Sequence, residues 1–113
     1  DVRQLRSVLQ KAKRKYDIKN VFIDYLQLMS GPGRSRDEEV GGITRTIKKI
    51  SMDEQIPITA LSQLNRSVET RGGAKKPKLS DLRESGSIEQ DTNTVMFLTR
   101  PEYDGTTVDS YGD

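Results

Sequence analysis

The stretch VFIDYLQ, residues 21–27, decides the fold, because an apolar run ends there on a carboxylate. Residues 20–24 form a short, nearly continuous apolar run, which is typical of a strand buried on both faces of a parallel sheet. The carboxyl ends of parallel strands share one edge of a sheet, and ligands bind at that edge. Asp24 at the strand tip therefore indicates a ligand site, although a lone aspartate in this place is often only a turn former.

The segments around this strand have the pattern of helices. Apolar residues at helical spacing over residues 2–12 predict an amphipathic helix that ends near Tyr16. Ser35 stands three residues before Glu38, which is the spacing of a capping box, and acidic residues follow in the first turn, where the helix dipole favours them. We therefore expect a second helix over residues 36–54.

Two further strands are expected downstream. Residues 58–61 read as a second short buried strand and residues 94–98 as a third. We expect residues 61–79 to be a long, polar, basic loop and residues 101–113 to be a loose acidic end. The alternation of helix and strand predicts an α/β fold, a parallel sheet flanked by helices, over residues 1–113.

A second polar residue follows the next strand. That strand runs out into Ser62 and Gln63, so Gln63 would emerge beside Asp24 if the two strands are neighbours. Neighbouring strands lie about 4.8 Å apart, so both side chains could reach one phosphate with its metal ion. An acid that orients magnesium and an amide that contacts the terminal phosphate are parts of a nucleoside triphosphatase.

Composition excludes several other kinds of site. The 113 residues contain no cysteine and no histidine, which excludes disulfides and the two commonest zinc ligands, so a bound metal would have to be a hard ion on oxygen ligands. No segment approaches the roughly 20 apolar residues of a membrane span, and we expect a soluble, cytoplasmic protein without a membrane partner. The phosphate-loop pattern GxxxxGK[ST] is absent, so the chain alone should bind a triphosphate weakly or not at all.

Basic residues cluster in residues 1–20 and 65–78. In the second cluster, Arg71, Lys75 and Lys76 flank a pair of glycines, which suits contact with a polyanion but also suits a solvated loop. Aromatic residues are few, so contact with nucleic acid would be mainly to the sugar-phosphate backbone.

A further candidate site, beside Asp24 and Gln63, is the segment LSDLRESGSIEQD, residues 79–91. Arg83 can pair with a phosphate, and Gly86 allows a backbone to approach closely. The alternative interpretation is two capped helical turns that carry surface charges.

Three segments together resemble a known family: VFIDYLQLMSG, ITALSQLNRSVETR and, most specifically, LSDLRESGSIEQDTNTVMFLTRPEY. They are similar to the carboxy-terminal motor domain of DnaB-like hexameric replicative DNA helicases, which has a RecA-like fold. The resemblance covers residues 16–104. It implies a motor that couples ATP hydrolysis, with Mg²⁺, to translocation on single-stranded DNA and duplex unwinding. It also implies a homo-hexamer, a primase and a helicase loader as partners.

The resemblance assigns roles to residues that match the family motifs. Asp24 falls on the Walker B aspartate, which helps to hold magnesium, and Gln63 falls on the glutamine that senses the terminal phosphate. Arg83, Glu84 and Gly86 match the segment that contacts the backbone of single-stranded DNA.

The basic loop that contains Arg71, Lys75 and Lys76 falls where the family has another loop near the DNA channel. In the family, the phosphate loop, the catalytic glutamate and the primase-binding domain would precede residue 1, and the arginine finger would follow Asp113. We therefore expect a partial motor domain that is inactive on its own.

Two other functions stay open. Asp24 could accept a phosphoryl group in a receiver-type signalling domain, although the acidic pair and the lysine of that fold are not found. The chain could also be a non-catalytic nucleic-acid-binding module whose function resides in its basic loop.

Overall fold

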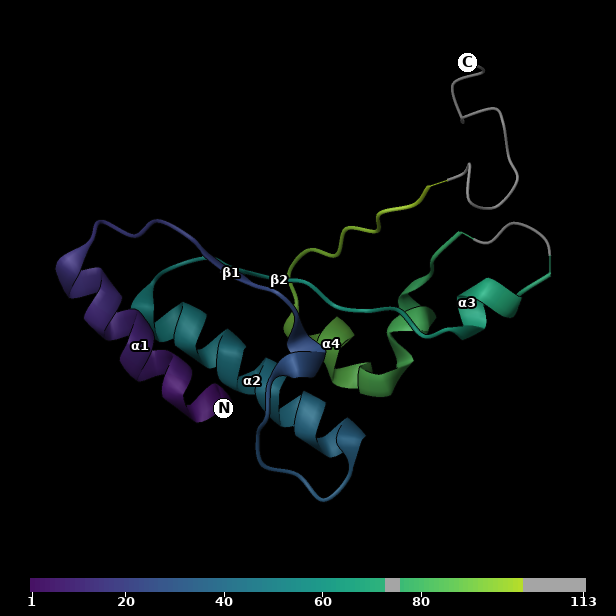
Figure 1. The fold of residues 1–113 in the computed structure, drawn as a ribbon, viewed down its shortest axis with the longest axis horizontal. Helices are drawn as coiled ribbons and strands as arrows, with labels where there is room; N and C mark the ends of the chain where they lie inside the picture. The colour runs from purple at the N-terminus through teal and green to yellow at the C-terminus, as the bar shows by residue number, and fades with distance from the viewer. Residues whose placement is uncertain (73–75, 101–113) are drawn as a thin grey trace, which may run out of the picture.

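Two short parallel strands with helices packed along them form the fold of this chain (Figure 1). The structure, a computed structural model, describes residues 1–72 and 76–100, and the side chains of residues 83–85 lie outside that description. The elements follow in the order α1 (Val2–Lys15), β1 (Val21–Ile23), η1 (Leu26–Leu28), α2 (Arg36–Glu54), β2 (Ile58–Ala60), α3 (Ser67–Thr70), η2 (Leu79–Ser85) and α4 (Gly86–Asp91), where η marks a 3-10 helix.

Local capping sets the beginnings of both long helices. The carboxylate of Asp1 accepts a hydrogen bond from the Arg3 amide at 2.8 Å, which caps α1. The hydroxyl of Ser35 accepts from the Glu38 amide at 3.2 Å, which caps α2. Such side chains satisfy amides that have no partner within the helix. Both predicted long helices are confirmed.

The apolar stripe of α2 is the centre of the core. Val40 and Ile43 are fully buried and pack with Val2 of α1 and with Leu82 and Ile88 from the elements that follow β2. Burial of one such aliphatic side chain stabilises the fold by about 1.5–3 kcal/mol. α2 contacts α1, η2 and α4, and apolar residues of both strands pack on the same core cluster, so this core holds the strands and the later turns together.

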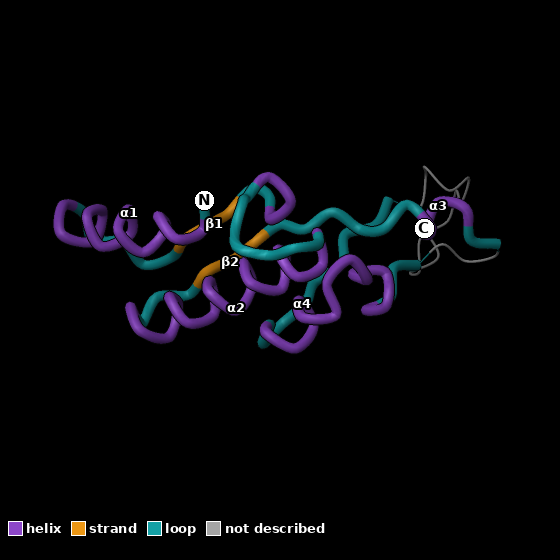
Figure 2. Tube along the Cα trace, turned by 90° about the horizontal axis from the view of Figure 1, so that it is seen from below, coloured by secondary structure: helices purple, strands orange, loops and turns teal. Residues whose placement is uncertain are grey.

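Among the residues that the structure describes, helices cover one face of the sheet. β1 and β2 pair in parallel, with Ile23 opposite Ala60. In Figure 1 both long helices lie below these strands, and Figure 2, seen from below, shows the strands running between α1 and α2 in projection. Val21 and Ile23 are half-buried toward the helices, whereas Phe22 points the other way and is 69% exposed. The prediction that the first strand is buried on both faces is therefore wrong for the part of the chain described, because no described element covers the second face.

The predicted third strand, residues 94–98, is also wrong within the described residues, because it forms no strand there. Its side chains nevertheless alternate: Val95 and Phe97 pack on the core, while Met96 and Leu98 are 79% and 94% exposed. The period of two is a property of the sequence, whereas a strand also needs a hydrogen-bonded neighbour. The predicted loose end, residues 101–113, lies outside the described residues. None of the described helices is long and apolar enough to cross a bilayer.

Candidate functional site

The two polar residues that were predicted to follow the strands, Asp24 and Gln63, lie beyond the ends of β1 and β2 at the same edge of the sheet. The Leu61 amide donates to the Ile23 carbonyl at 2.9 Å, so the pairing continues one residue past β2. Asp24 directly follows Ile23, Gln63 lies two residues after Leu61, and both residues are exposed. The prediction that the strands are parallel neighbours is confirmed, and it places an exposed carboxylate and an exposed amide beyond adjacent strand ends.

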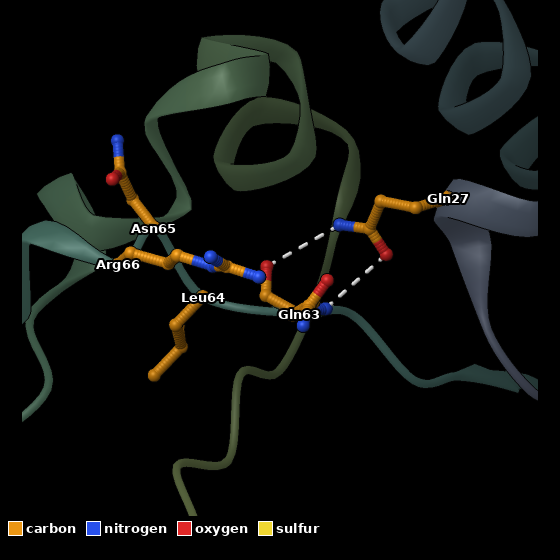
Figure 3. Close-up of a pocket in the computed structure, with 5 residues that line it drawn as sticks. All are labelled: Gln27, Gln63, Leu64, Asn65 and Arg66. Carbon is orange, nitrogen blue, oxygen red and sulfur yellow. Dashed lines mark hydrogen bonds between the residues drawn. The ribbon is translucent and has the colours of Figure 1, made fainter.

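The side chain of Gln27 fastens the backbone at Gln63 (Figure 3). Figure 3 shows that its Nε2 donates to the Gln63 carbonyl, at 3.3 Å, and its Oε1 accepts from the Gln63 amide, at 3.2 Å. The same Nε2 also donates to the Ser62 hydroxyl at 3.0 Å. The amide group therefore pairs with Gln63 much as a neighbouring strand would. No hydrogen bond of the Gln63 side chain is found within residues 1–72 and 76–100, so this arrangement holds the backbone and leaves that side chain available.

The first turn of α2 holds the segment around η1, which carries Gln27. Arg36 donates to the Gln27 carbonyl at 2.7 Å and to the Glu39 carboxylate at 2.6 Å. Glu39 also accepts from the Gly31 amide at 3.1 Å. The hydrogen bond from Arg36, and next that from Gly31, lower the pKa of Glu39, whereas desolvation acts in the opposite direction. The loop after β1 is thus tied to a rigid helix.

A polar hollow of about 240 Å³ opens beside Gln63. It is lined by Gln27, Gln63, Leu64, Asn65 and Arg66, and in Figure 3 the Arg66 side chain extends toward Gln63. Arg66 is exposed, so its guanidinium supplies positive charge at the rim. The hollow therefore connects the strand edge to the basic loop.

The predicted DNA-contacting turn spans the junction of η2 and α4. The side chains of Arg83 and Glu84 lie outside the described residues, as does all of Lys75. Gly86 is exposed, and a Cβ placed there would meet nothing within 4 Å. The open surface at Gly86 would let another molecule approach its backbone closely.

The basic loop uses one of its predicted DNA contacts internally. Arg71 forms an ion pair with Asp81, a residue that is 3% exposed, and its Nη1 donates to the Lys76 carbonyl at 3.2 Å. The Arg71 guanidinium is the main cause that lowers the pKa of Asp81, while burial acts in the opposite direction. Lys76 is exposed. Of these two predicted DNA contacts, Lys76 is therefore exposed, whereas Arg71 is already paired with a buried carboxylate.

Gln27 and Asp81 were not predicted from the sequence. Gln27 stands three residues after Asp24, and that proximity to the strand tip was the only available signal. Asp81 reads in the sequence as a residue of the first helical turn. Its burial and its partner depend on how the basic loop folds back, and neither follows from periodicity.

Comparison with known proteins supports one family. The profile of the DnaB-like helicase C terminal domain matches residues 1–111. The replicative DNA helicase DnaC of Bacillus subtilis is 47% identical over 105 residues, which are 90% of this chain and 23% of that protein. The replicative DNA helicase DnaB of Rickettsia prowazekii is 50% identical over 101 residues, which are 88% of this chain and 21% of that protein.

Solved structures agree in fold. An ATPase domain of known structure superposes with a TM-score of 0.84 at 41% identity, over 91% of this chain and 37% of that one. A DnaB-like replicative helicase, studied with its interactions with primase, superposes with a TM-score of 0.87 at 39% identity, over 97% of this chain and 27% of that one. The predicted RecA-like architecture is confirmed. The chain spans less than a quarter of the length of the two helicases compared by sequence.

Proposed function

The chain belongs to the family of DnaB-like helicase C-terminal domains, and from this premise we propose that it is the part of a replicative DNA helicase motor that joins the nucleotide edge to a DNA-contacting turn. The whole protein would couple ATP hydrolysis to translocation on single-stranded DNA and to duplex unwinding. Family membership removes the basis for the receiver-type alternative. Because the 113 residues contain no phosphate loop, hydrolysis would belong to the whole protein.

The observation that carries this proposal is the shared edge of β1 and β2. An exposed acid, Asp24, and an exposed amide, Gln63, follow adjacent parallel strand ends. Ligands of open α/β sheets bind beyond such ends. Gln63 would contact the terminal phosphate, and Gln27 would hold the backbone there in place through two hydrogen bonds to Gln63 and one to the Ser62 hydroxyl.

Magnesium fits the chemistry of Asp24. Mg²⁺ prefers oxygen ligands and usually takes one or two carboxylates together with waters and phosphate oxygens. Within the described residues no group of three acidic, histidine or cysteine side chains could hold a metal. In this proposal Asp24 would hold the ion through a water, and waters and nucleotide phosphates would supply the remaining ligands. The bound ion would neutralise charge on the phosphate oxygens.

The DNA side of the proposal involves the turn after η2 and the basic loop. Arg83, Glu84 and Gly86 would contact the sugar-phosphate backbone, and Lys75 and Lys76 would add positive charge nearby. Support comes from the open surface at Gly86 and from the family motif that these residues match. Such contacts are nearly independent of base sequence and sensitive to salt.

The partners follow from the same proposal. The whole protein would assemble as a homo-hexamer and would meet a primase and a helicase loader. One DnaB-like helicase of similar structure has been studied with primase, and the same class of partner is proposed here by family membership.

Substitution of Asp24 in the full-length gene product tests the nucleotide assignment. Asp24→Asn removes the charge but keeps the size, and we expect at least a tenfold loss of ATPase and unwinding rates with single-strand binding retained. Asp17→Asn, at an exposed site before β1, is the matched control and should behave as wild type. Normal ATPase activity in Asp24→Asn would refute the assignment.

Arg83→Ala in the same protein tests the DNA assignment. Loss of one phosphate contact should weaken single-strand binding and reduce the slope of log affinity against log salt by about 1. Unchanged affinity at all salt concentrations would contradict it. If Asp24→Asn has no effect while Arg83→Ala weakens binding, the non-catalytic binding module is the better description.

A further inference from the structure

We propose that Asp81 and Arg71 are positioning residues that clasp the basic loop onto the turn that carries Arg83, and that Arg71 is not itself a contact of the nucleic acid. The first part rests on contacts within this chain. The consequence for DNA rests on the proposed function, in which residues 83–86 meet single-stranded DNA.

Asp81 is the point at which three segments meet. Its carboxylate pairs with Arg71 through one oxygen and accepts from the Lys78 amide at 2.7 Å through the other. Its backbone carbonyl accepts from the Asn65 amide at 2.9 Å. One residue therefore holds the start of the loop, its middle and the turn that ends it.

The electrostatics favour a structural role for this pair. A carboxylate that is 3% exposed is costly unless it is paired and hydrogen-bonded, and Asp81 is both. The Arg71 side chain is 26% exposed, and two of its nitrogens are committed to Asp81 and to the Lys76 carbonyl. A phosphate would have to displace these partners in order to bind Arg71. Lys76 is exposed, and no hydrogen bond or ion pair of its ammonium group is found within the described residues, so it offers a phosphate no such competition.

The clasp also joins the two halves of the proposed site. Asn65 lies two residues after Gln63, and Arg83 lies two residues after Asp81. The hydrogen bond between Asn65 and Asp81 thus links the strand edge to the DNA-contacting turn by a short path. Since Gln27 fixes the backbone at Gln63, this path is anchored at the nucleotide end.

The test uses the full-length gene product with Asp81→Asn, Arg71→Ala and the double substitution. Glu69→Gln is the matched control, because it removes the same charge from an exposed side chain of the same loop. Binding of a fluorescent oligodeoxythymidine is measured over a range of salt, and trypsin cleavage after Arg71 is followed in the absence of DNA. If Asp81→Asn does not accumulate in folded form, Arg71→Lys, which keeps the charge but loses the planar fork, replaces it.

We expect Asp81→Asn and Arg71→Ala each to weaken DNA binding about tenfold, with an unchanged salt slope. Because both break one clasp, the double variant should be no weaker than either single variant. Asp81→Asn should be cleaved after Arg71 several times faster than Glu69→Gln.

Two results would overturn the proposal. If Asp81→Asn binds DNA as tightly as wild type while Arg71→Ala weakens binding and lowers the salt slope by about 1, Arg71 is a direct phosphate contact. Equal cleavage of Asp81→Asn and Glu69→Gln would show that no clasp orders the loop. If Arg83→Ala leaves binding unchanged, the proposed DNA function fails, and the cleavage rates still decide the clasp.

Discussion

Replacing Gln27 with alanine tests whether this side chain positions Gln63. The substitution removes all three hydrogen bonds between the Gln27 amide and residues 62 and 63, at 3.0, 3.3 and 3.2 Å. It leaves Asp24, Gln63 and the strand pairing untouched. The backbone groups that lose their partner are near solvent, so water can satisfy them and the fold should persist.

The size of the effect follows from these bonds. A hydrogen bond contributes about 0.5–1.5 kcal/mol net, and the two bonds to the exposed Gln63 belong at the low end. The three together favour the observed position of Gln63 by about 1.5–2 kcal/mol, which is roughly tenfold to thirtyfold in population. If turnover needs Gln63 in that position, the kcat for ATP should fall about tenfold, with little change in KM.

Steady-state ATPase measurements on the full-length gene product check this expectation. Gln63→Ala defines the loss when the amide itself is absent. Gln27→Glu keeps an acceptor for the Gln63 amide but loses the donor to its carbonyl, so it should lie between wild type and Gln27→Ala. Gln4→Ala removes an exposed glutamine from α1 and is the matched control.

One combination of rates would refute the reasoning. If Gln63→Ala is inactive while Gln27→Ala stays within twofold of wild type, Gln63 matters but its position does not depend on Gln27. The hydrogen bonds in Figure 3 would then have no part in turnover.

Three further predictions concern stability and pH in the same full-length protein. Ile43→Ala, at a side chain with no exposure, should destabilise the domain by about 2–5 kcal/mol in denaturant unfolding, and an effect below about 1 kcal/mol would show that Ile43 is not central to the core. Gly33→Ala would place a Cβ 2.4 Å from the Glu39 backbone nitrogen, so it should lower the melting temperature, and an unchanged melting temperature would contradict the described loop. Because Arg71 lowers the pKa of Asp81, the stability from this pair is fully present above the ordinary pKa of 3.8 and is lost as the pH falls through the lowered value. The difference in melting temperature between wild type and Asp81→Asn should therefore shrink below about pH 4, and a constant difference from pH 7 to pH 3 would oppose this account.

The sequence determined those features that depend on neighbours along the chain. The helix Arg36–Glu54 has the predicted bounds because its cap at Ser35 and its apolar stripe are local signals. That Asp24 and Gln63 follow the ends of neighbouring strands was predictable for a similar reason, since a strand, a covering helix and a second strand place consecutive strand ends at one edge. The family motifs also lie within continuous segments.

Only the tertiary structure decided which side chains contact one another around these strand ends and the loops that follow them. That Phe22 faces outward, and that residues 94–98 lack a strand partner, depend on which elements cover the sheet. Gln27 forms hydrogen bonds with the backbone at Gln63, and Arg71 forms an ion pair with Asp81. Both interactions depend on segments that fold back across the molecule. Glutamine and arginine have the same hydrogen-bonding groups in every sequence context, so the partner that each one finds is set by its position in the fold.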